Sequence, residues 1–224
     1  MPDVHAFQES VKKGDLAGVR ASLAENPSLL DATNEAGQSA FLLAMYYRQR
    51  ETADYLLSLG PKLDIFNACV AGQTARVLED LRSDPKLIEA HSPDGWTPLH
   101  LAAFFGHCEL ATALLDRGAG LDARSSNAMK NTPLHAAAAG GHVDVVELLL
   151  KRGANPNATQ EGGWTALHGA AQSGNRALLE VLLANGAHVN ARAANNQSPL
   201  DLALLKGHQD IAARLDELGA TLQQ

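Results

Sequence analysis

The hexapeptide Thr-Pro-Leu-His-Ala-Ala at residues 132–137 decides the fold, because close variants of it return along the chain. The variants begin at Thr97, Thr165 and Ser198, so the four copies start 35, 33 and 33 residues apart. Self-similarity at a fixed period of this size predicts a solenoid, in which one small structural unit is stacked on copies of itself.

Two further motifs follow each hexapeptide in register. The first is a glycine followed by His or Asn, as at residues 106–107, and the second is a Leu pair followed by Gly-Ala, as at residues 114–119. Thr or Ser suits a helix N-cap, Pro suits the first helical turn, and glycine suits the end of a helix. Each unit therefore reads as a short helix, a turn and a longer amphipathic helix.

These three motifs resemble those of the ankyrin repeat family, whose hexapeptide is Thr-Pro-Leu-His-x-Ala at a period of 33. The resemblance implies an all-α solenoid, a stack of helix-turn-helix repeats with projecting β-hairpin loops. A comparison of the N-terminal half with itself at a shift of 58 aligns Gly14 with Gly72 and Gly37 with Gly95. We therefore expect one domain over residues 1–224, with about seven repeats. Their boundaries lie near 4–36, 37–62, 63–94, 95–129, 130–162, 163–195 and 196–224.

Local departures from the repeat carry further predictions. We expect the first and last repeats to act as caps, because Arg214 and Asp216 replace apolar residues of the preceding repeat. The connection between Gly60 and Leu63 is too short for a hairpin. The prolines at 27 and 85 predict extra helical turns, and the loop at 123–132 is two residues longer than its counterparts.

The composition argues against several classes of function. The net charge of −7 argues against non-specific binding of nucleic acid or of an anionic membrane surface. No apolar run approaches the ~18 residues that span a bilayer, and the polar N-terminus does not resemble a signal peptide. The two cysteines, Cys69 and Cys108, fall in different repeats and need no disulfide. We expect a cytoplasmic protein.

Catalytic chemistry finds little support in the residues. In the family that the sequence resembles, the histidine of the hexapeptide and the one after glycine are structural and bond the backbone of turns and loops. No cysteines or carboxylates are spaced to complete a zinc site with them. Cys108 follows His107, but one neighbouring histidine is weak evidence for a nucleophile. We expect no enzyme activity, no catalytic residue, no metal and no cofactor.

A binding surface remains. In the same family the loop tips and the last outward positions of the first helix line a concave groove. Of the ten aromatic residues in the chain, six fall on such positions. The predicted partner-binding residues are these six and two at a loop tip: Tyr46, Tyr47, Trp96, Phe104, Phe105, Trp164, Met129 and Lys130. The first five could form one patch.

The prediction is thus a monomeric protein–protein interaction module or adaptor. Its acidic net charge favours a partner protein with a basic patch. Three alternatives stay open. The aromatic residues could serve packing between repeats, the histidines and Cys108 could bind a metal or small molecule, or the array could be a stable scaffold without a dedicated partner.

Overall fold

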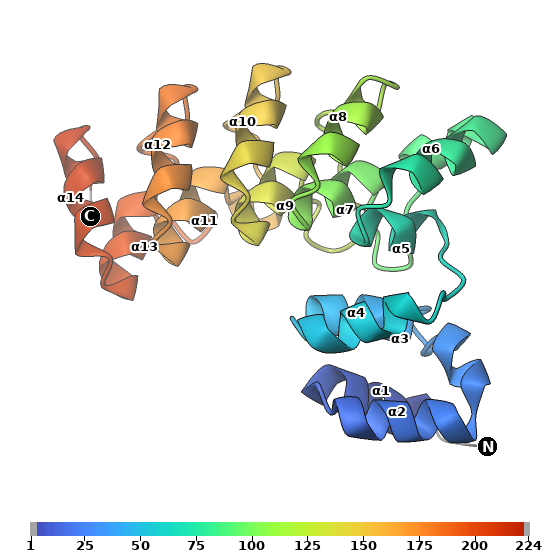
Figure 1. The fold of residues 1–224 in the computed structure, drawn as a ribbon. Coiled ribbons are helices and arrows are strands. Elements are labelled where there is room, and N and C mark those ends of the chain that lie inside the picture. The colour runs from blue at the N-terminus through green and yellow to red at the C-terminus, as the bar shows by residue number, and fades with distance from the viewer. Residues whose placement is uncertain (1–3, 222–224) are drawn as a thin grey trace. The chain divides into compact units, whose positions relative to one another are not determined.

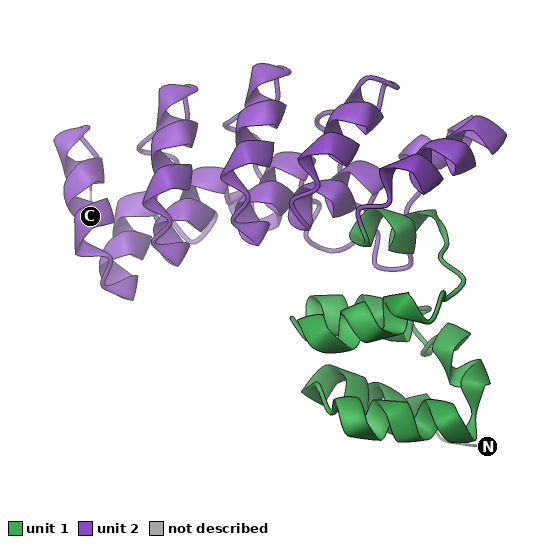
Figure 2. Cartoon of the chain, in the orientation of Figure 1, with its two compact units in different colours: residues 1–71 green, residues 72–224 purple. Residues whose placement is uncertain are grey.

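A computed structural model describes residues 4–221. Within them lie fourteen α-helices, three short 3₁₀ helices and no β-strand, which confirms the predicted all-α repeat solenoid. The chain divides into two compact units, residues 1–71 (unit 1) and 72–224 (unit 2), shown in Figure 2.

Unit 1 holds five α-helices and one 3₁₀ helix. They are α1 (Val4–Lys13), α2 (Leu16–Glu25), η1 (Pro27–Asp31), α3 (Ala40–Tyr46), α4 (Arg50–Ser58) and α5 (Ile65–Val70). Helix α1 packs on α2 and α3, and α3 packs on α4 and α5. The core between them is apolar, with Phe7, Val11, Val19, Phe41 and Leu56 at most 3% exposed.

Unit 2 continues the same alternation of helices (Figure 1). Its elements are α6 (Thr74–Ser83), η2 (Pro85–Glu89), α7 (Pro98–Phe104), α8 (Cys108–Leu115), α9 (Pro133–Gly140), α10 (Val143–Lys151), η3 (Glu161–Gly163), α11 (Ala166–Ser173), α12 (Arg176–Ala184), α13 (Pro199–Lys206) and α14 (Gln209–Glu217). Helices α7, α9, α11 and α13 pack in sequence as an inner row, and α6, α8, α10 and α12 pack as an outer row. In unit 1, α1, α3 and α5 are the inner helices by the same register.

The inner helices begin and end as their sequences predict. Ser39 accepts a hydrogen bond from the backbone N–H of Leu42 at 3.1 Å, and Thr97 accepts one from that of His100 at 3.4 Å. Each such bond satisfies one N–H group at the helix start. The turn after an inner helix needs a left-handed residue, which Gly106 supplies at φ 78°. In the second repeat that residue is Arg48, at φ 57°.

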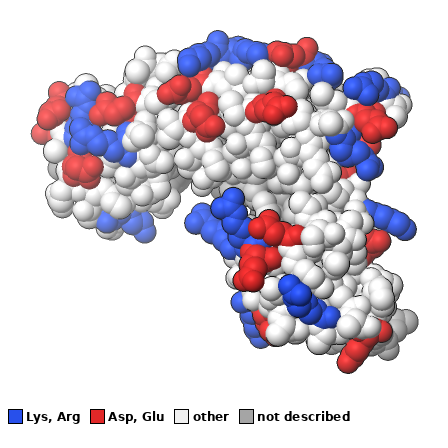
Figure 3. Space-filling model, in the orientation of Figure 1, with Lys and Arg blue, Asp and Glu red and all other residues white. Residues whose placement is uncertain are grey.

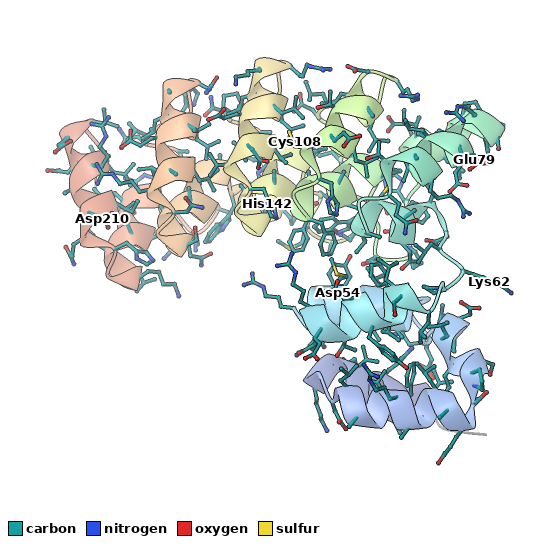
Figure 4. The ribbon with its side chains drawn as sticks, viewed as in Figure 1. Asp54, Lys62, Glu79, Cys108, His142 and Asp210 are labelled. Atoms are coloured by element: carbon teal, nitrogen blue, oxygen red, sulfur yellow. The ribbon has the colours of Figure 1, made fainter. Side chains whose placement is uncertain are left out.

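The connections agree with the irregularities of the sequence. Helices η1 and η2 form the extra turns expected at the two prolines, and residues 60–64 run without a hairpin around Lys62 (Figure 4). The loops before the hexapeptides close through backbone bonds such as Ser92 N–H to Trp96 O, at 2.8 Å. Their hairpin shape does not extend to strands: among residues 4–221, the isolated bridge between Thr33 and Ser39 is the one β-interaction.

Candidate functional site

The hexapeptide histidines, His100, His135 and His168, are structural links between repeats. The Nδ1 atom of His135 lies 2.8 Å from the Thr132 hydroxyl and accepts a hydrogen bond from the Thr132 backbone N–H at 3.3 Å. Because Nδ1 accepts, Nε2 carries the proton and donates to the Trp164 carbonyl at 3.1 Å. His168 repeats this arrangement toward Gln197, and His100 reaches the Asn131 carbonyl at 3.0 Å. The predicted backbone role of these residues is confirmed.

Burial keeps these histidines neutral. Desolvation is the main cause that lowers the pKa of His100 and of His135 to about 4, and it lowers the pKa of His168 as well. A neutral imidazole can donate through one nitrogen and accept through the other, as these links require.

Little points to metal or thiolate chemistry in the described part of the chain. Within residues 4–221, no three His, Cys, Asp or Glu side chains gather closely enough to hold a metal ion. Cys108 opens α8 and is half-buried, and its burial raises the pKa of the thiol (Figure 4). A raised pKa disfavours the thiolate that a nucleophile or a metal ligand needs. Cys69 is buried in unit 1.

Three aromatic residues of unit 2 form an ordered cluster at the end of α7. The rings of Trp96 and Phe104 meet edge to face with centroids 5.2 Å apart, and those of Phe104 and Phe105 do so at 5.1 Å. All three side chains are only half-buried. Edge-to-face contacts of this kind hold aromatic rings in fixed positions while leaving part of their surface accessible.

The two tyrosines of the predicted patch belong to unit 1. Tyr46 is half-buried at the end of α3, and Tyr47 is 53% exposed, with the Lys12 ammonium 5.8 Å from its ring centre. Since the five aromatic residues are divided between the two units, a single patch made of them stays a prediction.

The loop tips of unit 2 are joined to one another by backbone hydrogen bonds. Ser126 donates to the Gly95 carbonyl at 2.8 Å, Glu161 to Met129 at 2.8 Å, and Ala194 to Gly162 at 2.7 Å. Such bonds fix the spacing of successive tips, and we call this row of hydrogen-bonded tips the loop ladder. The side chain of Met129, on one of these tips, is 49% exposed. The ammonium of Lys130 lies 4.0 Å from the Glu161 carboxylate, on an exposed surface where such a pair contributes little stability.

Sequence reasoning missed two residues that order the long loop. Arg124 donates to the Lys130 carbonyl at 2.9 Å and also to the Thr159 carbonyl in the next loop. The side chain of Asn127 donates to the Asp94 carbonyl at 2.9 Å in the preceding one. The two-residue insertion was the available signal, because extra loop length needs extra hydrogen bonds to be ordered.

A hollow of about 290 Å³ opens between α9 and α11, and Trp164 lines one side of it. Its floor includes Gly169, where a Cβ atom would meet nothing within 4 Å. The same register position holds a buried leucine at Leu101 and Leu202. The missing side chain therefore opens this part of the inner face. The glycine at this position of the hexapeptide was the sequence signal from which the hollow could have been predicted.

No helix within residues 4–221 is both long and apolar enough to cross a membrane.

Comparison with known proteins agrees with this geometry. Residues 65–160 and 156–224 match a family model described as ankyrin repeats (3 copies). Ankyrin repeat and SAM domain-containing protein 6 of Danio rerio is 29% identical over 119 residues, which cover 49% of this chain and 16% of that protein. The protein of the same name from Mus musculus is 33% identical over 99 residues, covering 40% of this chain and 11% of the relative. The chain thus matches well under two thirds of the length of either relative.

Proposed function

The chain belongs to the ankyrin repeat family, and we propose that it is a non-enzymatic interaction module that binds a partner protein on its inner helices and loop tips. Ankyrin repeats are generally protein–protein interaction modules, and the family is generally non-enzymatic. The observation that carries the proposal is the placement of aromatic side chains. Tyr47 is 53% exposed, and the Trp96–Phe104–Phe105 cluster is half-buried at the end of an inner helix.

Aromatic side chains suit this role because they bring a large contact area at a small loss of conformational freedom. Residues that dominate binding energy at interfaces are enriched in Trp, Tyr and Arg. We assign partner contacts to the aromatic residues at the ends of the inner helices, to the tryptophans before the hexapeptides and to the long loop tip. The set is Tyr46, Tyr47, Trp96, Phe104, Phe105, Trp164, Met129 and Lys130.

The preformed loop ladder supports binding without large rearrangement. The tips of unit 2 are held in register by the bonds at Gly95, Met129 and Gly162, so a partner meets a surface that is already ordered. The net charge of −7 favours a partner with a basic patch, mainly through a faster association. We further propose that the protein acts as a monomer in the cytoplasm, with residues 1–224 as one repeat domain.

A capture experiment tests the assignment. Wild-type protein and a Tyr47→Glu, Phe105→Glu double variant are used as bait in lysate of the source organism, with identification of captured proteins by mass spectrometry. The matched control is Leu59→Glu, Leu218→Glu. It places the same charge on the residues that directly follow α4 and α14, one in each unit, which are 43% and 41% exposed.

All baits must first show the same helical circular dichroism, so that loss of fold is not mistaken for loss of binding. We expect a partner that binds wild type and the control but not the Tyr47→Glu, Phe105→Glu variant. Equal capture by all three baits, or loss only with the Leu59→Glu, Leu218→Glu control, would overturn the proposal.

A further inference from the structure

Arg48 stands where the repeat otherwise has glycine. The turn after an inner helix is left-handed in each repeat, and glycine takes that position at residues 14, 72, 106, 141, 174 and 207, with φ between 67° and 79°. Arg48 adopts the same conformation at φ 57°. A side chain in this region is strained relative to glycine, which is a reason to ask whether this side chain has a role other than stability.

The neighbouring turn brings a second cation to this place. The side chain of Gln49 donates to the Lys12 carbonyl at 2.9 Å, which joins the turn after α3 to the turn after α1. Gly14 lies against the Gln49 side chain in the same contact. The two turns therefore adjoin. Three residues on them are exposed, Lys13, Tyr47 and Arg48, and we name these three residues the turn surface.

The charges of the turn surface are available to a partner. Lys12 is hydrogen-bonded to Glu9 at 2.8 Å, a contact that lowers the pKa of the Glu9 carboxyl and raises that of the lysine, so these two charges balance each other. Asp15 uses its carboxylate to cap α2 through the Gly18 N–H at 3.0 Å. By contrast, neither Lys13 nor Arg48 forms an ion pair with a carboxylate among residues 4–221.

Cationic side chains gather locally in unit 1, although the whole protein is acidic. Figure 3 shows Lys and Arg side chains gathered beside the turn that joins α3 to α4, with acidic side chains following along α4. In unit 2 the two residues before the turn glycine are uncharged at 104–105, 139–140 and 172–173, and a lysine returns only at 206. A cationic turn with an exposed tyrosine is thus a feature of unit 1.

We propose that the turn surface binds an acidic segment of a partner protein, in which carboxylates pair with Lys13 and Arg48 and an apolar side chain packs on Tyr47. A protein segment fits better than nucleic acid, because two cations on two turns form no continuous track for a phosphate backbone. The proposal rests on the proposed function, since it names the chemistry of one part of the partner.

Fluorescence anisotropy with a labelled synthetic peptide of alternating Glu, Asp and Leu tests it at low and high salt. The comparison probes are the same peptide with Gln and Asn in place of the acids, and a single-stranded oligonucleotide. The variants are Arg48→Gly, Arg48→Lys and Lys13→Gln. The matched control is Arg82→Gln, which removes one exposed cation from α6.

We expect the acidic peptide to bind wild type in a salt-sensitive way and the amide peptide not to bind. Arg48→Gly should weaken binding about fivefold, and its combination with Lys13→Gln still further. Arg48→Lys and Arg82→Gln should stay within about twofold of wild type. Because glycine adopts the left-handed turn freely, Arg48→Gly should unfold thermally at or above the wild-type midpoint, which separates lost binding from lost fold.

Equal binding by wild type and Arg48→Gly, an equal loss with Arg82→Gln, or tighter binding of the oligonucleotide would overturn the inference. Failure here leaves the capture experiment on Tyr47 and Phe105 unaffected. If the acidic peptide binds through Arg48 but all baits capture the same partner equally, the two results together contradict the proposed function and support this inference.

Discussion

Unit 2 and unit 1 hold the same register of inner helices together by different chemistry. In unit 2 the hexapeptide histidines each bond a helix start to the loop of the next repeat, at Nε2 to carbonyl distances of 3.0 or 3.1 Å. Each of these histidines precedes the left-handed turn residue of its repeat by six positions. The same position in unit 1, counted from the turn residues, holds Gln8, Leu42 and Phe66. Unit 1 joins its repeats through hydroxyl and amide groups instead, such as the Ser39 hydroxyl, which donates to the Asn67 side chain at 2.8 Å. The difference shows that repeats can be linked by imidazoles or by polar groups that do not titrate near neutral pH, and that the imidazole links should make stability depend on pH.

The largest effect expected from this comparison is the acid sensitivity of unit 2. The pKa of His100 and of His135 is about 4 in the folded protein, against 6.5 without burial. Between these values the unfolded chain binds more protons than the folded chain, so stability is present above pH 6.5 and is lost as the pH falls toward 4. By pH 4 each histidine should have lowered the free energy of unfolding by about 3 kcal/mol.

Tryptophan fluorescence measures this effect in the right place, because both tryptophans, Trp96 and Trp164, lie in unit 2. The free energy of unfolding in urea is compared at pH 6.5 and pH 5. Most carboxylates titrate below pH 5, so they contribute little to the difference. A free energy of unfolding that is the same at both pH values would show that the histidine links do not behave as buried neutral groups.

Replacement of one link by the residue of unit 1 should have the next largest effect. His135→Leu places at this position the side chain that Leu42 has in unit 1, but it leaves the Trp164 carbonyl and the Thr132 N–H without their partner. We expect a loss of about 2–3 kcal/mol in urea unfolding, because two buried polar groups lose a hydrogen bond. The control His188→Leu, at an exposed position, should change stability by less than about 0.5 kcal/mol. Equal effects would mean that the link contributes nothing specific.

Unit 1 should respond in the opposite direction at the same register. Gln8 is 3% exposed, and its side-chain nitrogen has no hydrogen-bond partner within residues 4–221. Gln8→Met removes that buried donor at similar length, so we expect a gain of about 1–2 kcal/mol in the free energy of unfolding, measured with urea and far-ultraviolet circular dichroism. A loss of stability would show that the amide has a partner that holds unit 1 together.

The smallest effect concerns the hollow on the inner face of unit 2. Gly169 lies within helix α11, and a Cβ there would meet nothing within 4 Å. Gly169→Ala should raise stability by about 0.5–1 kcal/mol through the helix propensity of alanine. Gly106→Ala is the contrasting control, since φ is 78° and the new Cβ would lie 2.3 Å from the His142 ring. Thermal unfolding that ranks the two variants the other way would contradict the geometry.

Much of the fold follows from the sequence because the repeat is self-consistent. Helix starts at Thr or Ser, helix ends at glycine and the backbone role of the histidines all arise from contacts within one repeat or with the next one. The short connection at 60–63 and the extra turns at Pro27 and Pro85 were predictable for the same reason, since chain length limits what a loop can form.

Other features depend on three-dimensional packing that spacing does not encode. The bonds between loop tips, the role of Arg124 and the division into two compact units are of this kind. Spacing predicted that Trp96, Phe104 and Phe105 lie near one another, and their rings are in contact, but spacing could not say how exposed they are. Their role in partner binding stays a prediction. Arg48 was readable as a missing glycine, but its left-handed conformation had to come from the structure.

Site-specific photo-cross-linking tests most directly whether the inner helices carry partner binding. The photoreactive residue benzoylphenylalanine replaces Tyr47 or Phe105 in separate samples. In matched controls it replaces Leu59 or Leu218, at the C-terminal ends of α4 and α14. After irradiation in lysate of the source organism, we predict a discrete product of higher mass from the two inner positions and none from the controls. Products from Leu59 and Leu218 but not from Tyr47 and Phe105 would contradict the assignment and place partner binding on the outer helices.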